Sequence, residues 1–128
     1  MTDPLVSAAR AAQQHAYAPY SHFRVGAAVE GADGRVFTGC NVENASFGLT
    51  ICAERAAIAA AVTAGVRRFR RAVVVTDADP PAAPCGACRQ VLAEFEPDLP
   101  IMAVGPKATA SWTMAELLPA AFGKGQLP

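Results

Sequence analysis

The sequence has no uninterrupted apolar run of about 20 residues, the length that a membrane-spanning helix needs. Its first ten residues, MTDPLVSAAR, lack the basic region and long apolar segment of a secretory signal, so we expect a cytoplasmic protein. The 11 basic and 11 acidic residues leave no net charge, which argues against a protein built mainly to bind nucleic acid. Neither a membrane nor a nucleic acid is therefore expected as a partner.

Histidine is also scarce. The chain has two, His15 and His22, and neither has metal-ligand spacing with another candidate residue, so we expect structural or surface roles for both. The sequence has four cysteines instead. In a reducing compartment, thiols indicate metal binding or catalysis before disulfides.

Hydrophobic residues make up 52% of the 128 positions, so a packed core is expected and residues 1–128 should form a single domain. Local patterns predict helices at 4–17, 51–64 (capped by Thr50), 85–96 and 114–118, and strands at 23–30, 35–43, 71–77, 100–105 and 110–114. The run RRFRR at 67–71 is predicted to be a solvated segment after a helix. Alternating helices and strands predict an α/β fold, a three-layer α/β/α sandwich around a central mixed sheet.

Three cysteines have the placement of a zinc site. Cys85 and Cys88 are three positions apart at a helix start, so both thiols lie on one face of the first turn. Cys52 stands at the start of another helix. Three thiolates hold Zn²⁺ with a fourth position open, which is typical of a catalytic site and not of a structural one.

Two charged residues follow Cys52 closely. Glu54 would place a carboxylate beside the open position of the metal, where it could act as a general acid and base. Arg55 could donate hydrogen bonds to the thiolate sulfurs and offset their excess negative charge, or it could be an ordinary exposed arginine in an ion pair.

The fourth cysteine, Cys40, lies in a predicted strand. Period-two alternation groups its side chain with apolar neighbours, so we expect a small buried residue and not a ligand. The same alternation turns Asn41 and Glu43 to the other face. That pair suits the hydroxyl of a sugar-like ligand, although an ordinary solvent-facing sheet edge explains it as well.

Several longer segments of the sequence resemble those of a known protein family. C-A-E followed by P-C-x-x-C is the signature of zinc nucleobase deaminases, with Cys52 where many members have histidine. The segments YAPYSHFRVGAA, GCNVENASFGLTICAER, PCGACRQV and ELLPAAFG closely resemble the small cytidine deaminases of pyrimidine salvage. The match runs from about Tyr17 to Phe122.

The resemblance implies an α/β/α deaminase fold, a homotetramer and one Zn²⁺ per subunit. It implies hydrolysis of cytidine and 2′-deoxycytidine to the uridines with release of ammonia. It also implies a role for each matching residue: ligands Cys52, Cys85 and Cys88, proton shuttle Glu54, thiolate contact Arg55, ribose 3′-hydroxyl contacts Asn41 and Glu43, base-stacking Phe23, and Phe122 reaching a neighbouring subunit's pocket. Phe47 stands where many relatives have tyrosine, so it keeps a stacking surface without the hydroxyl.

Three alternatives remain at this point. A relative that acts on a cytosine-containing antibiotic nucleoside would share the zinc core. A polynucleotide deaminase would need a positively charged single-strand groove, which the neutral composition disfavours. A zinc-stabilised binding module without catalysis would have no use for Glu54 beside an open metal position.

Overall fold

Five strands form one mixed sheet in the order β2-β1-β3-β4-β5. The structure, a computed structural model, describes residues 3–128. Only the β3–β4 pair is parallel, and the other neighbours run antiparallel. The strands are β1 (Gly26–Gly31), β2 (Val36–Cys40), β3 (Phe69–Val75), β4 (Pro100–Val104) and β5 (Thr109–Thr113).

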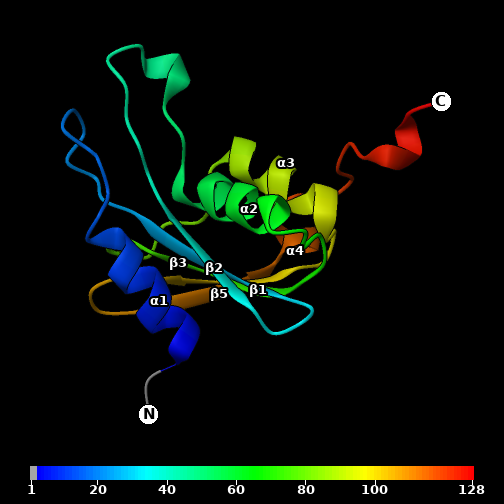
Figure 1. The fold of residues 1–128 in the computed structure, drawn as a ribbon, viewed down its shortest axis with the longest axis horizontal. Coiled ribbons are helices and arrows are strands. Elements are labelled where there is room, and N and C mark those ends of the chain that lie inside the picture. Colours follow the sequence, from blue (N-terminus) through cyan, green and yellow to red (C-terminus); the bar gives the residue numbers. More distant parts are fainter. Residues whose placement is uncertain (1–2) are drawn as a thin grey trace.

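Helices cover both faces of this sheet, which confirms the predicted α/β sandwich (Figure 1). One face carries α1 (Pro4–Gln13), and the other carries α2 (Ala53–Thr63), α3 (Gly86–Phe95) and the short α4 (Met114–Leu117). Two single 3₁₀ turns, η1 (Phe47–Leu49) and η2 (Lys124–Gln126), lie outside these layers. Within residues 3–128, no helix has the length and apolar character needed to cross a membrane.

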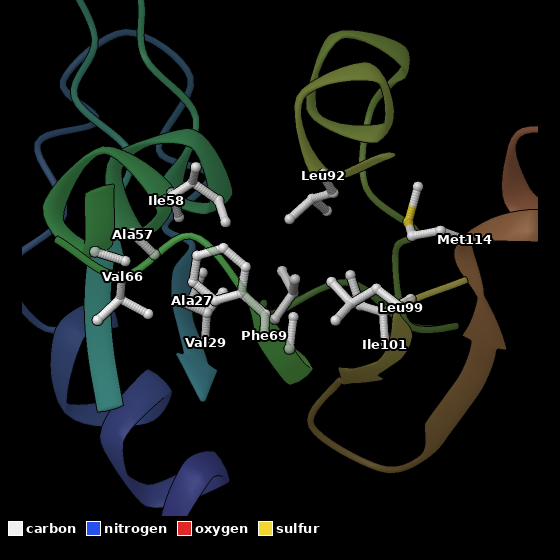
Figure 2. Packing of buried hydrophobic residues seen from close by; sticks show 14 of the residues in the cluster. Ala27, Val29, Ala57, Ile58, Val66, Phe69, Leu92, Leu99, Ile101 and Met114 are labelled. Atoms are coloured by element: carbon white, nitrogen blue, oxygen red, sulfur yellow. The ribbon is translucent and has the colours of Figure 1, made fainter. Parts of the chain in front are cut away.

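The central strand β3 supplies both cores because its residues are buried on alternating faces. Val73 and Val75 pack with Leu5 and Ala9 of α1. The opposite side chains join a larger core under α2 and α3, where Ile58 and Leu92 point toward the sheet (Figure 2).

Two glycines let helices approach the sheet closely. A Cβ at Gly26 of β1 would collide with the carbonyl oxygen of Ala9 and lie 2.5 Å from the backbone nitrogen of Gln13, both in α1. A Cβ at Gly39 of β2 would lie 2.5 Å from the carbonyl oxygen of Ala53 in α2. Because only glycine fits at either point, Gly26 determines how closely α1 packs on the sheet and Gly39 determines the same for α2.

Three predicted boundaries are wrong. The first helix ends at Gln13 and not near Tyr17, because the Tyr17 N–H donates to the Asn41 carbonyl at 2.9 Å in an extended pairing. The cap of α2 is Cys52 and not Thr50. The arginines at 67, 68 and 70 are exposed, as predicted for a solvated run, but β3 begins within this run at the buried Phe69 and not at 71.

The residues of β2 alternate between two faces as predicted, but the buried face is the opposite of the predicted one. Phe37 packs against the core beneath α2, whereas Val36 on the other face is 45% exposed. Cys40 is therefore only partly buried and not the buried apolar residue that alternation predicted. Asn41, expected on a polar face, is buried at 7% exposure. The reason is that β2 is an edge strand whose inward face contains Gly39, which gives no apolar signal.

Candidate metal centre and adjoining cavity

The helices α2 and α3 are each preceded by a cysteine. Cys52 is the N-cap of α2 and Cys85 the N-cap of α3, and neither side chain makes a capping hydrogen bond. Cys88, one turn into α3, is fully buried. The sulfurs of all three residues are thus left free to face one another.

The three sulfur atoms fit one tetrahedral ion. The Cys52 and Cys85 Sγ atoms lie 3.7 Å apart, and those of Cys85 and Cys88 lie 3.5 Å apart. A tetrahedral ion with Zn–S bonds of about 2.3 Å holds its sulfurs about 3.8 Å apart. Among the described residues this is the one group of three or more potential ligands close enough for a metal, and Cys40 is not part of it.

Arg55 contacts this cluster from outside. Its Nη2 donates to Cys52 Sγ at 3.4 Å and to the Thr50 carbonyl oxygen at 3.5 Å. The Nε atom of Arg55 is buried and has no partner within residues 3–128. The guanidinium therefore lies against the thiolates as a source of positive charge, and no carboxylate pairs with it in the described chain.

The electrostatics of the cluster favour a thiolate. Hydrogen bonds from Cys88, Arg55 and Cys85, with the positive charge of Arg55, together lower the pKa of the Cys52 thiol to about 5 against the opposing effect of burial. The pKa of the buried Cys88 thiol is raised, because its proton is held by the Cys52 sulfur. Both helix N-termini add partial positive charge at the sulfurs.

A cavity of about 280 Å³ opens beside the cluster. Cys52, Cys85 and Glu54 contribute to one part of its lining. Glu54 is 5% exposed, and this burial raises the pKa of its carboxyl to about 7. Glu54, Cys52 and Cys85 thus line one concave space, and Cys88 lies buried behind it.

Phe23, Asn41 and Glu43 also line this cavity. The Asn41 Nδ2 donates to the Phe23 carbonyl oxygen at 2.7 Å, and its Oδ1 accepts from the Val25 N–H at 2.9 Å. The strand end and the loop before β1 are therefore hydrogen-bonded together at the cavity wall.

Two residues that were predicted to contact the substrate, Phe47 and Phe122, do not line this cavity. Phe47 is 72% exposed and lines an adjoining cavity of about 400 Å³, where its ring meets Tyr20 edge-on with centroids 5.8 Å apart. Phe122 is 59% exposed and lines neither cavity. Its carbonyl oxygen accepts a hydrogen bond from Gln90 Nε2 at 2.8 Å, which attaches the carboxyl-terminal segment to α3.

Sequence reasoning missed three polar residues that line the cavity beside the sulfur cluster: Ser21, Thr76, and Thr50, which was predicted only as a helix cap. Thr76 follows β3 directly and is buried, so its position one residue after a buried strand was a usable signal. Ser21 lies in an irregular loop, and only the folded arrangement brings it to the site.

Comparison with known proteins agrees with this site. Residues 2–103 match the family model described as the cytidine and deoxycytidylate deaminase zinc-binding region. The fold and the three-cysteine cluster thus define a zinc-dependent deaminase. The chain belongs to the cytidine deaminase family.

Individual relatives match over nearly their whole length. The cytidine deaminase of Sporosarcina psychrophila is 45% identical over 127 residues, which span 98% of this chain and 93% of that protein. The crystal structure of cytidine deaminase from Burkholderia pseudomallei has a TM-score of 0.90 at 49% identity and covers 95% of this chain and 100% of that one. The cytidine deaminase structure from Mycobacterium tuberculosis has a TM-score of 0.82 at 45% identity, covering 93% and 94%. These relatives do not support an antibiotic nucleoside as substrate.

Proposed function

We propose that this protein hydrolyses cytidine and 2′-deoxycytidine to uridine and 2′-deoxyuridine, releasing ammonia, as a cytoplasmic enzyme of pyrimidine salvage. One observation carries the proposal: two of the three sulfurs with zinc spacing, those of Cys52 and Cys85, line the same cavity as a buried carboxylate and Phe23, Asn41 and Glu43. The names of the relatives support the same reaction.

In this proposal Cys52, Cys85 and Cys88 hold one Zn²⁺ per chain. When bound, zinc with an open position supplies Lewis acidity that activates water as a nucleophile near neutral pH. Arg55 donates to Cys52 Sγ and offsets the negative charge of three thiolates, which would otherwise weaken that acidity.

Glu54 moves the protons. Its carboxylate accepts a proton from water as the water oxygen bonds to C4 of the base. It then delivers this proton to ring N3, takes the second proton from the new C4 hydroxyl and passes it to the amino group. The C4–N bond breaks as the C4 carbonyl forms, and ammonia leaves. Burial suits both roles, because a desolvated carboxyl group gains and loses a proton closer to neutral pH than an exposed one.

The opposite wall binds the nucleoside. Phe23 offers a ring for stacking against the base, and Asn41 and Glu43 offer polar groups to the ribose 3′-hydroxyl. Asn41 keeps one N–H of Nδ2 and one lone pair of Oδ1 for a ligand after its two backbone hydrogen bonds. Phe47, in the adjoining cavity, adds an apolar surface next to this wall.

The lining favours a nucleoside over its 5′-phosphate. Among the described residues that line the two cavities, none is lysine, arginine or histidine, whereas Glu43 and Glu54 are acidic. A phosphate dianion would meet carboxylates and no cationic partner.

The active unit in this proposal is a homotetramer. Apolar side chains are exposed on and beside the arm at 41–51, which extends from the body of the fold (Figure 1). They include Tyr17, Tyr20, Val42, Phe47, Leu49 and Ile51. An exposed apolar surface of this extent is typical of an interface between subunits. Phe122, exposed at the end of the chain, would close the pocket of a neighbouring subunit.

The reaction is tested by the ultraviolet spectrum of cytidine incubated with zinc-loaded protein, with ammonia measured in parallel. We expect stoichiometric uridine and ammonia from cytidine and 2′-deoxycytidine, and much slower turnover of cytidine 5′-phosphate. Absence of uridine with protein that contains one zinc per chain would refute the activity.

The shared pocket is tested with Phe122→Ala, which should raise KM strongly and leave zinc content intact, by mixing its chains with Glu54→Ala chains under conditions where subunits exchange. A hybrid can contain pockets with Glu54 from one chain and Phe122 from another, so partial activity is expected. Light scattering gives the subunit number. A fully active monomer, or no rescue despite proven exchange, would reject the tetramer.

A further inference from the structure

The Glu43 carboxylate is held by the loop that precedes Phe23. Its Oε1 accepts the backbone N–H of Tyr20 at 2.9 Å and that of Ser21 at 3.1 Å. Its Oε2 accepts the hydroxyl of Ser21. Of the two carboxylate oxygens, Oε1 is thus occupied by two backbone donors, and Oε2 keeps a lone pair for a ligand.

The Ser21 hydroxyl has one proton, and the ionised carboxylate can only accept, so Ser21 is the donor. The Ser21 oxygen in turn accepts the N–H of Phe23 at 3.0 Å. This single hydroxyl therefore joins the carboxylate to the backbone of the residue whose ring faces the cavity. The pKa of Glu43 is lowered, chiefly by this hydrogen bond, which keeps the carboxyl ionised.

The same loop is fixed from its other side. The Phe23 carbonyl oxygen accepts a hydrogen bond from Asn41 Nδ2 at 2.7 Å. A continuous path of hydrogen bonds therefore runs from Asn41 through Phe23 and Ser21 to Glu43. Ser21 is the one side chain on this path between the two polar residues, and it lines both cavities.

We propose that Ser21 is a positioning residue that orients Oε2 of Glu43 to accept a hydrogen bond from the 3′-hydroxyl of the substrate's sugar. The inference rests on the proposed function and adds a residue to it. Without the Ser21 hydroxyl, only Oε1 anchors the carboxylate, so the whole group can pivot about that oxygen and Oε2 loses its fixed direction. The loss then falls on the sugar contact and not on the base.

The experiment compares three nucleosides with the Ser21→Ala variant: cytidine, 2′-deoxycytidine and 3′-deoxycytidine. We expect kcat/KM to fall on the order of tenfold for the first two, mainly through KM, because a hydrogen bond to a charged group is lost. For 3′-deoxycytidine, which lacks the hydroxyl, the change should be under about twofold, with no contact left to lose. Ser21→Thr, which keeps a hydroxyl, should restore most of the loss.

A negative control, Ser7→Ala, and a positive control, Glu43→Gln, accompany the Ser21→Ala variant. Ser7→Ala removes an exposed hydroxyl on α1, which lines neither cavity, and should leave all three nucleosides unchanged. Glu43→Gln should show the same discrimination as Ser21→Ala, and the double variant should lose little more than Glu43→Gln alone, because both changes remove one interaction.

If Ser21→Ala does not fold, Ser21→Cys keeps the shape with a weak donor and should give the same pattern at smaller size.

Equal losses on all three nucleosides would overturn the proposal, since Ser21 would then act through the loop or through Phe23. Unchanged kinetics for Ser21→Ala, with Glu43→Gln still selective, would overturn it and leave the sugar site intact. If Glu43→Gln also fails to distinguish the nucleosides, the sugar assignment in the proposed function is wrong.

Discussion

On each face of the sheet a glycine allows one helix to pack closely, but the two helices bring different kinds of residue to the sheet. On one face α1 lies against Gly26, and on the other α2 lies against Gly39. The buried residues of α1 are the apolar Leu5 and Ala9 and the polar Gln13, which donates to the Arg24 carbonyl oxygen at 3.1 Å. The cap of α1, Asp3, pairs with Arg71 at 2.7 Å. The start of α2 brings Cys52 and Glu54 to the cavity.

The difference shows that similar packing can serve stability on one face and the position of reacting groups on the other. Changes near α1 should alter the free energy of unfolding and leave the chemistry of the folded protein intact. Changes at the start of α2 or α3 should do the opposite. The predictions below test that separation.

The largest effect is expected from Cys52→Ala, which removes a proposed ligand. We expect zinc content to fall from one ion per chain to nearly none, with loss of measurable turnover. Cys40→Ala is the matched control, because Cys40 lies on β2 outside the sulfur cluster. Metal analysis of both purified variants decides the matter, and loss of zinc in Cys40→Ala with retention in Cys52→Ala would reverse the assignment.

Glu54→Gln should come next. We expect a folded protein with full zinc and a kcat lowered about 10²–10⁴-fold, the usual contribution of a positioned general acid and base. The steady-state rate with saturating cytidine measures this loss. Near-normal turnover would mean that another group moves the protons.

The two glycines give a matched pair. Gly39→Ala should push the start of α2 outward and weaken zinc binding about 10- to 100-fold, as happens when the residues supporting a metal site are changed. Gly26→Ala should destabilise the fold by about 1–3 kcal/mol or more through overpacking against α1, with zinc affinity unchanged. Competition with a chelator and denaturant unfolding measure the two quantities. Similar zinc affinities in the two variants would remove the distinction between the faces.

The smallest effect concerns Asp3. Hydrogen bonds from Arg71 and from the Leu5 N–H lower its pKa from the ordinary 3.8 to about 2. Because the folded-state pKa is depressed, the charge stabilises the fold above the ordinary pKa, and this contribution is lost as the pH falls toward 2. Asp3→Asn, which can still cap α1, should therefore lower the Tm slightly at pH 7 and not at about pH 2.

The measurement for Asp3 is thermal unfolding across this pH range, with Asp98→Asn, at an exposed position, as control. The kcat of Asp3→Asn should equal that of the unaltered protein, since α1 carries none of the proposed catalytic groups. A Tm difference that persists undiminished at about pH 2 would show that the effect of Asp3 is not its charge.

The sequence predicts what depends on neighbours along the chain. Cys85 and Cys88 share a helix turn whatever surrounds them, and the last helix begins at Met114 as predicted, with Thr113 and Glu116 forming a capping box at its start. The order of helices and strands is also predicted, because each element has its own apolar period or run.

Features that depend on contacts between distant segments were missed. The end of α1 is set by pairing of Tyr17 with the segment at 41–43, and the buried face of β2 is set by the approach of α2 to Gly39. Asn41 and Glu43 were predicted as a pair on one strand face, yet their geometry comes from the loop at 20–25 that bonds to both. Ser21 could not be found for the same reason.

The sulfur cluster joins α2 to α3 across a sequence separation of 33 residues. An ion that binds only when those helices are assembled draws the folding equilibrium toward the native state by mass action. Each tenfold rise in free zinc above the dissociation constant then adds about 1.4 kcal/mol to the free energy of unfolding. The fraction of this chain that is folded is thereby tied to the metal supply of its surroundings.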